Sequence, residues 1–182
     1  MYFKEQGIQN TKETLQLAIK AAKERGIKHI VLATTEGSTP DALENTEGLN
    51  IVIVTHAYGS REKGVNSLSE EKRQAYIDKG YKVCTAAHTL SGVERAITTK
   101  FGGIYPAEII ANTLRLFGQG TKVCVEIAAM AADGGYVPPF ESIIAIGGSS
   151  RGADTALILR TAYSSTILDT KVDEIICKPI EK

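Results

Sequence analysis

The sequence predicts an α/β protein, a three-layer sandwich whose central sheet is mixed but mostly parallel. Short uninterrupted apolar runs, such as residues 30–33 and 51–54, are typical of strands buried on both faces of a parallel sheet. Segments with apolar residues at helical spacing alternate with these runs. This alternation favours helices on both faces of one sheet. Because 182 residues fall short of two ordinary domains, we expect a single domain over residues 1–182.

The first half of the chain predicts helices and strands in alternation. Asn10 and Glu13 have the spacing of a capping box, and apolar residues then recur at three and four residues until Gly26. Ser69 opens another helix that runs to Gly80. The helices of this half are therefore expected at residues 10–26, 39–45 and 69–80, and the strands at 30–33, 51–54 and 81–85.

The second half begins with helices and ends with strands. Pro106 suits the first turn of a helix, and the Gly pair at 134–135 ends the next apolar stripe. We expect helices at residues 93–99, 106–117 and 123–134, a loop at 101–105, and strands at 142–146, 156–159 and 174–177.

Charge and hydropathy exclude several classes of protein. The 21 Lys plus Arg residues balance 21 Asp plus Glu, so the formal net charge is zero. A dedicated nucleic-acid binder carries a basic surface, so we expect no nucleic-acid partner. No run approaches the roughly 18 apolar residues of a membrane span, and the first residues lack the basic-then-apolar order of a signal peptide. These features predict a cytoplasmic protein that does not bind membranes.

The cysteines and histidines predict neither a disulfide framework nor a metal site. Cys84, Cys124 and Cys177 are far apart and form no C-x-x-C pair. The three histidines form no H-x-x-x-H or H-E-x-x-H arrangement. Cys84 ends a predicted strand, where the thiol is either reactive or, as we expect, buried and inert.

Polar loops follow four of the predicted strands. In a mostly parallel sheet, ligands bind beyond the carboxyl ends of the strands, so these loops are expected to line one rim. The candidate ligand-binding residues are Thr34, Thr35, Gly37, Ser38 and Thr39 in the first loop, Thr55, His56 and Gly59 in the second, and Gly147, Gly148, Arg151, Asp154 and Thr155 in the fourth; the third loop spans residues 85–88.

The first loop has two interpretations. Its hydroxyl groups and Gly37 precede a short helix, so free backbone N–H groups could hold a phosphate. The same residue types also make an ordinary helix cap and turn. No Gly-Lys-Ser/Thr is present, which excludes a Walker loop. Glu36 must point away from a bound phosphate, or the affinity falls.

The fourth loop and the histidines also leave alternatives open. The glycines and Arg151 suit a second anionic or polyhydroxyl group, although a solvated hairpin turn has a similar composition. His56 is either an acid–base group or a loop anchor. Glu126 is the one acidic residue of an apolar helix and lies either at the site or on the solvated side; the sequence does not decide.

Two of these loops resemble segments of the C-terminal α/β domain of pyruvate kinase. Residues 30–39 are similar to its strand and phosphate loop, and residues 143–155 to its strand, Arg- and Gly-rich effector loop and returning strand. The whole chain resembles a family of free-standing archaeal and bacterial proteins classed as pyruvate kinase α/β domain-like. The phrases that carry this wider likeness are Thr55-His56-x-x-Gly59, Phe101-Gly102-Gly103-Ile104, residues 117–127 and Arg151-Gly152-Ala153-Asp154-Thr155-Ala156.

The resemblance implies a ligand class rather than a reaction. It implies flavin mononucleotide (FMN) in the crevice, with the phosphate on residues 34–39. The flavin ring and ribityl chain would lie across Thr55, His56 and Gly59 toward the fourth loop. Pyruvate kinase chemistry belongs to a separate barrel domain, which 182 residues cannot contain beside this one, so we expect no pyruvate kinase activity.

Two function classes follow from these expectations. As an enzyme, the chain would be an FMN-dependent oxidoreductase with His56 and Asp154 as its catalytic residues. The alternative is a non-catalytic module that senses a sugar phosphate or another metabolite. Apolar helix faces also predict a homo-oligomer.

Overall fold

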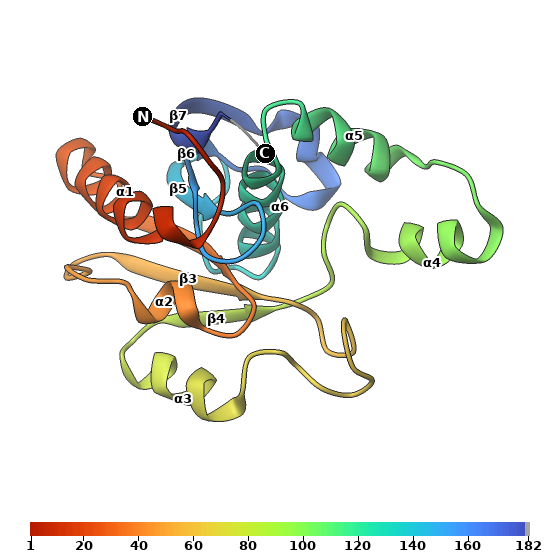
Figure 1. Ribbon diagram of the computed structural model, residues 1–182, viewed down its shortest axis with the longest axis horizontal. Coiled ribbons are helices and arrows are strands. Elements are labelled where there is room, and N and C mark those ends of the chain that lie inside the picture. The colour runs from red at the N-terminus through yellow and green to blue at the C-terminus, as the bar shows by residue number, and fades with distance from the viewer. Residues whose placement is uncertain (181–182) are drawn as a thin grey trace.

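The computed structural model describes residues 1–180, in which seven strands form one mixed sheet (Figure 1). The order across the sheet is β1-β7-β6-β5-β2-β3-β4. Only β6 runs antiparallel to its neighbours; the other pairs are parallel, as predicted. The strands are β1 (Tyr2–Phe3), β2 (His29–Thr34), β3 (Asn50–Thr55), β4 (Lys82–Thr85), β5 (Ser142–Gly147), β6 (Thr155–Arg160) and β7 (Lys171–Pro179).

Helices cover both faces of this sheet, which confirms the predicted three-layer α/β fold. Successive side chains of a strand point to opposite faces. Thus Ile30 and Leu32 of β2 pack with α1 and α3, whereas Val31 packs with α6. The helices are α1 (Thr11–Arg25), α2 (Ser38–Asp41), α3 (Glu70–Asp78), α4 (Gly92–Phe101), α5 (Pro106–Arg115) and α6 (Gln119–Asp133), with short 3-10 helices η1 (Ile8–Asn10) and η2 (Ser164–Asp169). None of these helices has the length and apolar character that crossing a bilayer requires, within residues 1–180.

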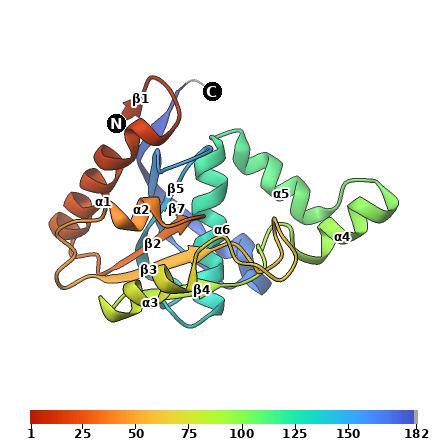
Figure 2. The same ribbon diagram turned by 60° about the horizontal axis from the view of Figure 1, so that its bottom comes forward.

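Helices α4 and α5 form an arm that projects from the body of the molecule (Figures 1 and 2). No residue of α4 is buried, and Ala111 is the one buried residue of α5. The two helices are tied to each other: a Glu94 carboxylate oxygen accepts from the N–H of Ala107 at 2.9 Å, and a Glu108 oxygen accepts from the Thr98 hydroxyl at 3.1 Å. The arm carries large exposed apolar side chains, namely Val93, Phe101, Ile104 and Ile109.

The structure differs from the sequence-based expectations at several element ends. The capping box at Asn10 does not form, because Asn10 is itself helical and its side-chain amide donates to the carbonyl of Glu5 at 2.7 Å. The helix expected at 39–45 is the single turn α2, since the chain turns back after Asp41 and reaches a positive φ of 57° at Asn45. The two-residue strand β1 has too few residues to give a recognisable pattern.

The approach of α6 to β6 leaves no room for a side chain at Gly120. A methyl group there would lie 2.0 Å from Thr155 Oγ1 and 2.5 Å from Thr155 Cβ. Helix propensity alone makes Ala better than Gly by about 1 kcal/mol, whereas overpacking costs about 1–3 kcal/mol. We predict that Gly120→Ala lowers the free energy of unfolding, measured in urea.

The control for this prediction is Gly26→Ala, where φ is +66° and nothing lies within 4 Å of the added methyl. Gly26→Ala should lower the free energy of unfolding by about 1–2 kcal/mol, because Ala is strained in a left-handed backbone conformation. If the Gly120→Ala protein is as stable as the parent, α6 and β6 do not pack as closely at Gly120 as described.

Candidate functional site

A cavity of about 450 Å³ lies beyond the carboxyl ends of β2, β3 and β5. The loops after β2, β3, β4 and β5 all contribute to its wall, and α4, α5 and α6 add further residues. The polar lining consists of Thr34, Thr35, Glu36, Ser38, Thr39, Thr55, His56, Arg61, His88, Arg95, Arg115, Gln119, Lys122, Glu126, Ser149, Ser150 and Arg151. The four polar loops therefore converge on one rim.

The predicted site residues divide into two groups by position. Thr34, Thr35, Ser38, Thr39, Thr55, His56, Gly148 and Arg151 line the cavity. Gly37, Gly59, Gly147, Asp154 and Thr155 lie outside the lining. What any of them binds stays a prediction.

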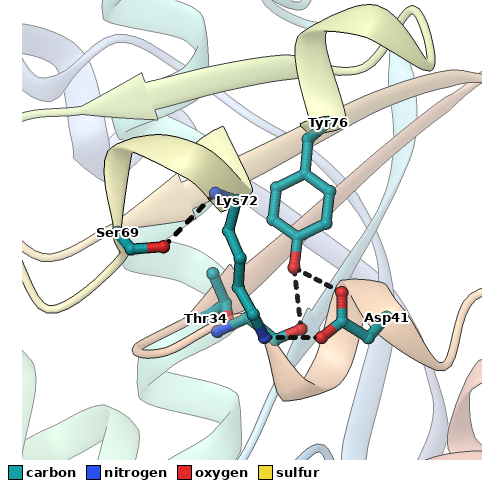
Figure 3. A network of polar contacts seen from close by, with 6 residues as sticks. Thr34, Asp41, Ser69, Lys72 and Tyr76 are labelled. Atoms are coloured by element: carbon teal, nitrogen blue, oxygen red, sulfur yellow. Dashed lines mark hydrogen bonds and ion pairs between the residues drawn. The ribbon is translucent and has the colours of Figure 1, made fainter. Parts of the chain in front are cut away.

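The β2–α2 loop is held in shape by α3 (Figure 3). Gly37 has a φ of +99°, and its N–H donates to Thr34 Oγ1 at 3.0 Å. The buried hydroxyl of Tyr76 lies 2.9 Å from the carbonyl oxygen of Gly37 and 2.7 Å from Asp41 Oδ1, and Lys72 Nζ donates to Asp41 Oδ2 at 2.6 Å. A methyl at Gly37 would lie 2.5 Å from that hydroxyl, so this turn requires glycine.

The charges around this loop are paired. Burial alone would raise the pKa of Asp41, but Lys72 and Tyr76 lower it overall. Burial and the hydrogen bond to Asp41 raise the pKa of Tyr76, which stays protonated. Glu36 lines the cavity, and its Oε1 accepts from Arg61 at 3.2 Å. The positive charge of Arg61 thus offsets the negative charge of Glu36 beside the loop.

Asp154 lies beneath the β5–β6 loop, and both of its carboxylate oxygens accept hydrogen bonds from other groups of the chain. The residue is 1% exposed. Its Oδ2 accepts from the N–H groups of Gly7 at 3.1 Å and Ser149 at 3.2 Å, and its Oδ1 accepts from the Thr155 hydroxyl at 2.8 Å. These bonds hold the loop against the segment before α1, while Arg151 stays exposed at the cavity.

Glu126 points toward the site, which settles the alternative that the sequence left open. Glu126 and Lys122 are 3% and 6% exposed and both line the cavity. Lys122 Nζ donates to Glu126 Oε2, and the N–H of Leu90 donates to Oε1 at 3.0 Å. His88 Nδ1 lies 3.8 Å from Oε2. One buried carboxylate therefore joins α6, the start of the arm and a histidine.

His56 and His88 form an edge-to-face pair, with ring centroids 5.2 Å apart. Burial lowers the pKa of each histidine, and the neighbouring imidazole lowers that of His56 further. Glu126 acts in the opposite direction on both without reversing the shift. Both imidazoles are therefore neutral near pH 7 and can accept a proton.

The cavity is positively charged although the chain as a whole is not. Five basic side chains line it against two acidic ones, which leaves a net charge of +3 with neutral histidines. Glu36 pairs with Arg61 and Glu126 with Lys122. Among residues 1–180, Arg95, Arg115 and Arg151 have no acidic group within salt-bridge distance.

A family model described as pyruvate kinase, alpha/beta domain, matches residues 12–159. The chain belongs to this family. The match runs from α1 through β6, so this pyruvate kinase α/β domain includes the β2–α2 loop, the arm, α6 and the β5–β6 loop. The resemblance seen in the sequence is confirmed at the level of the family and its fold.

Sequence reasoning missed several lining residues: Arg61, Arg95, Arg115 and Lys122. A signal existed for Lys122, because Lys and Glu four residues apart on an otherwise apolar helix favour a buried ion pair. Cys84 is buried, burial raises its pKa, and its thiol faces the carbonyl of Met130, in keeping with an inert group.

We predict that Tyr76→Phe destabilises the protein by about 1–2 kcal/mol, because the buried carbonyl of Gly37 loses its hydroxyl partner. Urea denaturation measures the change. Tyr81→Phe is the matched control, since within residues 1–180 the one hydrogen-bond partner of that hydroxyl is Thr46 Oγ1, at 3.1 Å, and its loss should cost less. A larger loss in Tyr81→Phe would contradict the structural role given to Tyr76.

The lowered pKa values of His56 and His88 predict a loss of stability in acid. The unfolded chain takes up protons near the ordinary histidine pKa, about 6.5, before the folded chain does. The free energy of unfolding should therefore fall as the pH drops from 7 to 5. Urea titrations at both pH values should show a smaller fall for the His56→Asn/His88→Asn double variant, in which His29 remains as a common background; equal falls would refute the shift.

Proposed function

We propose that this chain binds a phosphorylated small molecule in the cavity, and that the ligand is FMN. The observation that carries the proposal is the net charge of +3 in the cavity of a chain with zero formal net charge. A lining with an excess of positive charge favours an anionic ligand, because like-signed side chains around one concave site add their fields. The volume of about 450 Å³ is within the usual range for small-molecule sites.

The phosphate is assigned to the β2–α2 loop and Arg151. The hydroxyl groups of Thr35 and Ser38 line the cavity there, and the Tyr76–Asp41–Lys72 network fixes the loop before a ligand arrives. Arg151 supplies forked donors from the β5–β6 loop, which Asp154 supports from below. A loop fixed in advance spends less entropy on binding.

The flavin ring is assigned to the wall near the paired histidines. Val54, Val123 and Ile127 give the cavity an apolar surface against which a ring can pack. Bound FMN would supply redox chemistry, and neutral His56 is placed to hold or accept a proton at the cavity. We assign the acid–base role to His56 rather than Asp154, because both oxygens of Asp154 already accept hydrogen bonds.

A second candidate function is a metabolite-sensing module. The exposed apolar side chains of the arm favour it, because Phe101 and Ile104 offer a surface that a second protein could recognise. A sensor needs the same anionic ligand but no turnover. Reduction of bound FMN by a nicotinamide cofactor separates the two functions.

The first test is a visible absorbance spectrum of the purified protein, followed by mass spectrometry of what denaturation releases. Titration with added FMN, followed by flavin fluorescence, then gives the affinity. We predict that Arg151→Ala weakens FMN binding about 10- to 100-fold, because it removes a charge-assisted contact worth about 1.5–3 kcal/mol.

The matched control is Arg160→Ala, because Arg160 pairs with Asp173 outside the cavity lining. Its FMN affinity should equal that of the parent. A colourless protein that also fails to bind added FMN would reject FMN as the ligand, and unchanged affinity in Arg151→Ala would reject this phosphate assignment.

A further inference from the structure

We propose that Arg95 and Arg115 form a second anion-binding position in the same cavity, which holds the carboxylate or phosphate of a small-molecule substrate beside the ligand on the β2–α2 loop. The inference rests on the proposed function and deepens it, since it names the chemical class of the second molecule. Its basis is the part of the cavity wall that the arm contributes.

Two helices of the arm bring their arginines to one cavity. Arg95 lies on α4 and Arg115 ends α5, and both line the cavity although the arm projects from the body (Figure 2). Arg151, the third arginine that forms no salt bridge within residues 1–180, belongs to the β5–β6 loop instead. The uncompensated positive charge is thus divided between two parts of the wall.

The Arg115 guanidinium is positioned by neutral groups. Its Nε donates to Gln119 Oε1 at 2.7 Å, and one terminal nitrogen donates to Asn112 Oδ1 at 2.8 Å. Both acceptors are uncharged amide oxygens, so they orient the guanidinium without neutralising it. A guanidinium has five N–H donors, and the remaining ones can bind a carboxylate or phosphate in the forked geometry that arginine favours.

The acidic residues of the arm do not compensate these charges. Glu94 and Glu108 accept hydrogen bonds from Ala107, Thr98 and Tyr105, within the arm itself. Glu94 is the neighbour of Arg95 in sequence, yet its carboxylate caps α5 instead of pairing with that arginine. The carboxylates therefore brace the arm itself, and its two arginines form no salt bridge with any acidic group of residues 1–180.

The histidine pair lies beside the start of the arm, because Glu126 accepts from the N–H of Leu90 and lies 3.8 Å from His88 Nδ1. Burial lowers the pKa of His88 and the charge of Arg95 lowers it further, and the His88 ring packs edge to face against His56. A substrate held at its anionic end by Arg95 and Arg115 would extend toward the imidazoles. That is the part of the lining to which we assign the flavin ring, so the two molecules would meet where a proton can be accepted.

The test is a titration of FMN-saturated protein with inorganic phosphate and, separately, with succinate, followed by amide chemical shifts in two-dimensional NMR. We predict saturable chemical-shift changes in residues 92–95 and 112–119 with at least one of the two anions. The anion that binds more tightly shows whether the position prefers a phosphate or a carboxylate group. The Arg95→Gln/Arg115→Gln variant should weaken binding of that anion at least 10-fold and leave FMN affinity within about twofold, because it removes both charged contacts to the anion and none to FMN.

The matched control is Lys100→Gln on the same arm, whose ammonium lies 5.3 Å from the centre of the Phe101 ring and outside the cavity lining. It should bind both anions like the parent. Absence of saturable shifts in the arm, or an equal loss in Lys100→Gln, overturns the second position. A parallel loss of FMN affinity in the arginine variant also overturns it, because the arm would then belong to the first site.

If the protein does not take up FMN, the same two titrations are run on the free protein. Shifts in the arm that the Arg95→Gln/Arg115→Gln variant loses would then support the second position while the FMN assignment fails. Shifts confined to residues 34–39 would overturn the second position and keep the phosphate loop.

Discussion

Glu126 places a negative charge inside the buried helix α6, and both the cavity and the arm depend on how that charge is satisfied. Lys122 supplies the counter-charge one turn away, and the N–H of Leu90 binds the second oxygen just before α4 begins. Removing one partner from a buried ion pair typically costs about 3–5 kcal/mol, because the remaining charge stays desolvated. The start of the arm is therefore fixed to the helix that forms the cavity wall.

The sheet topology explains why chemistry gathers at one edge. Parallel strands β2, β3 and β4 send their following loops to the same rim. Strand β6 breaks this pattern, because it returns antiparallel beside β5 through a tight loop instead of a crossover helix. That loop folds over the rim, where Asp154 ties it to the segment before α1. The antiparallel strand thus brings Arg151 to the same cavity as the loops of the parallel strands.

The sequence was sufficient for the fold and for part of the cavity. Apolar runs identify buried strands directly, and the polar residues that follow them, such as Ser38 and His56, could be placed at the rim by topology alone. Arg95 and Arg115 could not be assigned to the cavity in this way. The sequence pattern of an amphipathic helix is the same whether its arginine faces solvent or a cavity. The hydrogen bond between Asp154 and the N–H of Gly7 could not be predicted either, because the two residues are remote in sequence.

The arm has both of its attachments on one short stretch of α6. The chain enters the arm at Leu90, bonded to Glu126, and leaves it at Phe117, whose carbonyl accepts from the Thr121 hydroxyl at 3.1 Å. Thr121 and Glu126 are five residues apart, about 7.5 Å along a helix axis. Closely spaced chain ends are one reason why whole inserted segments are tolerated in proteins. Residues 92–115 therefore have the geometry of an insertion, and another segment with the same spacing between its ends could replace them while the sheet and the β2–α2 loop keep their places.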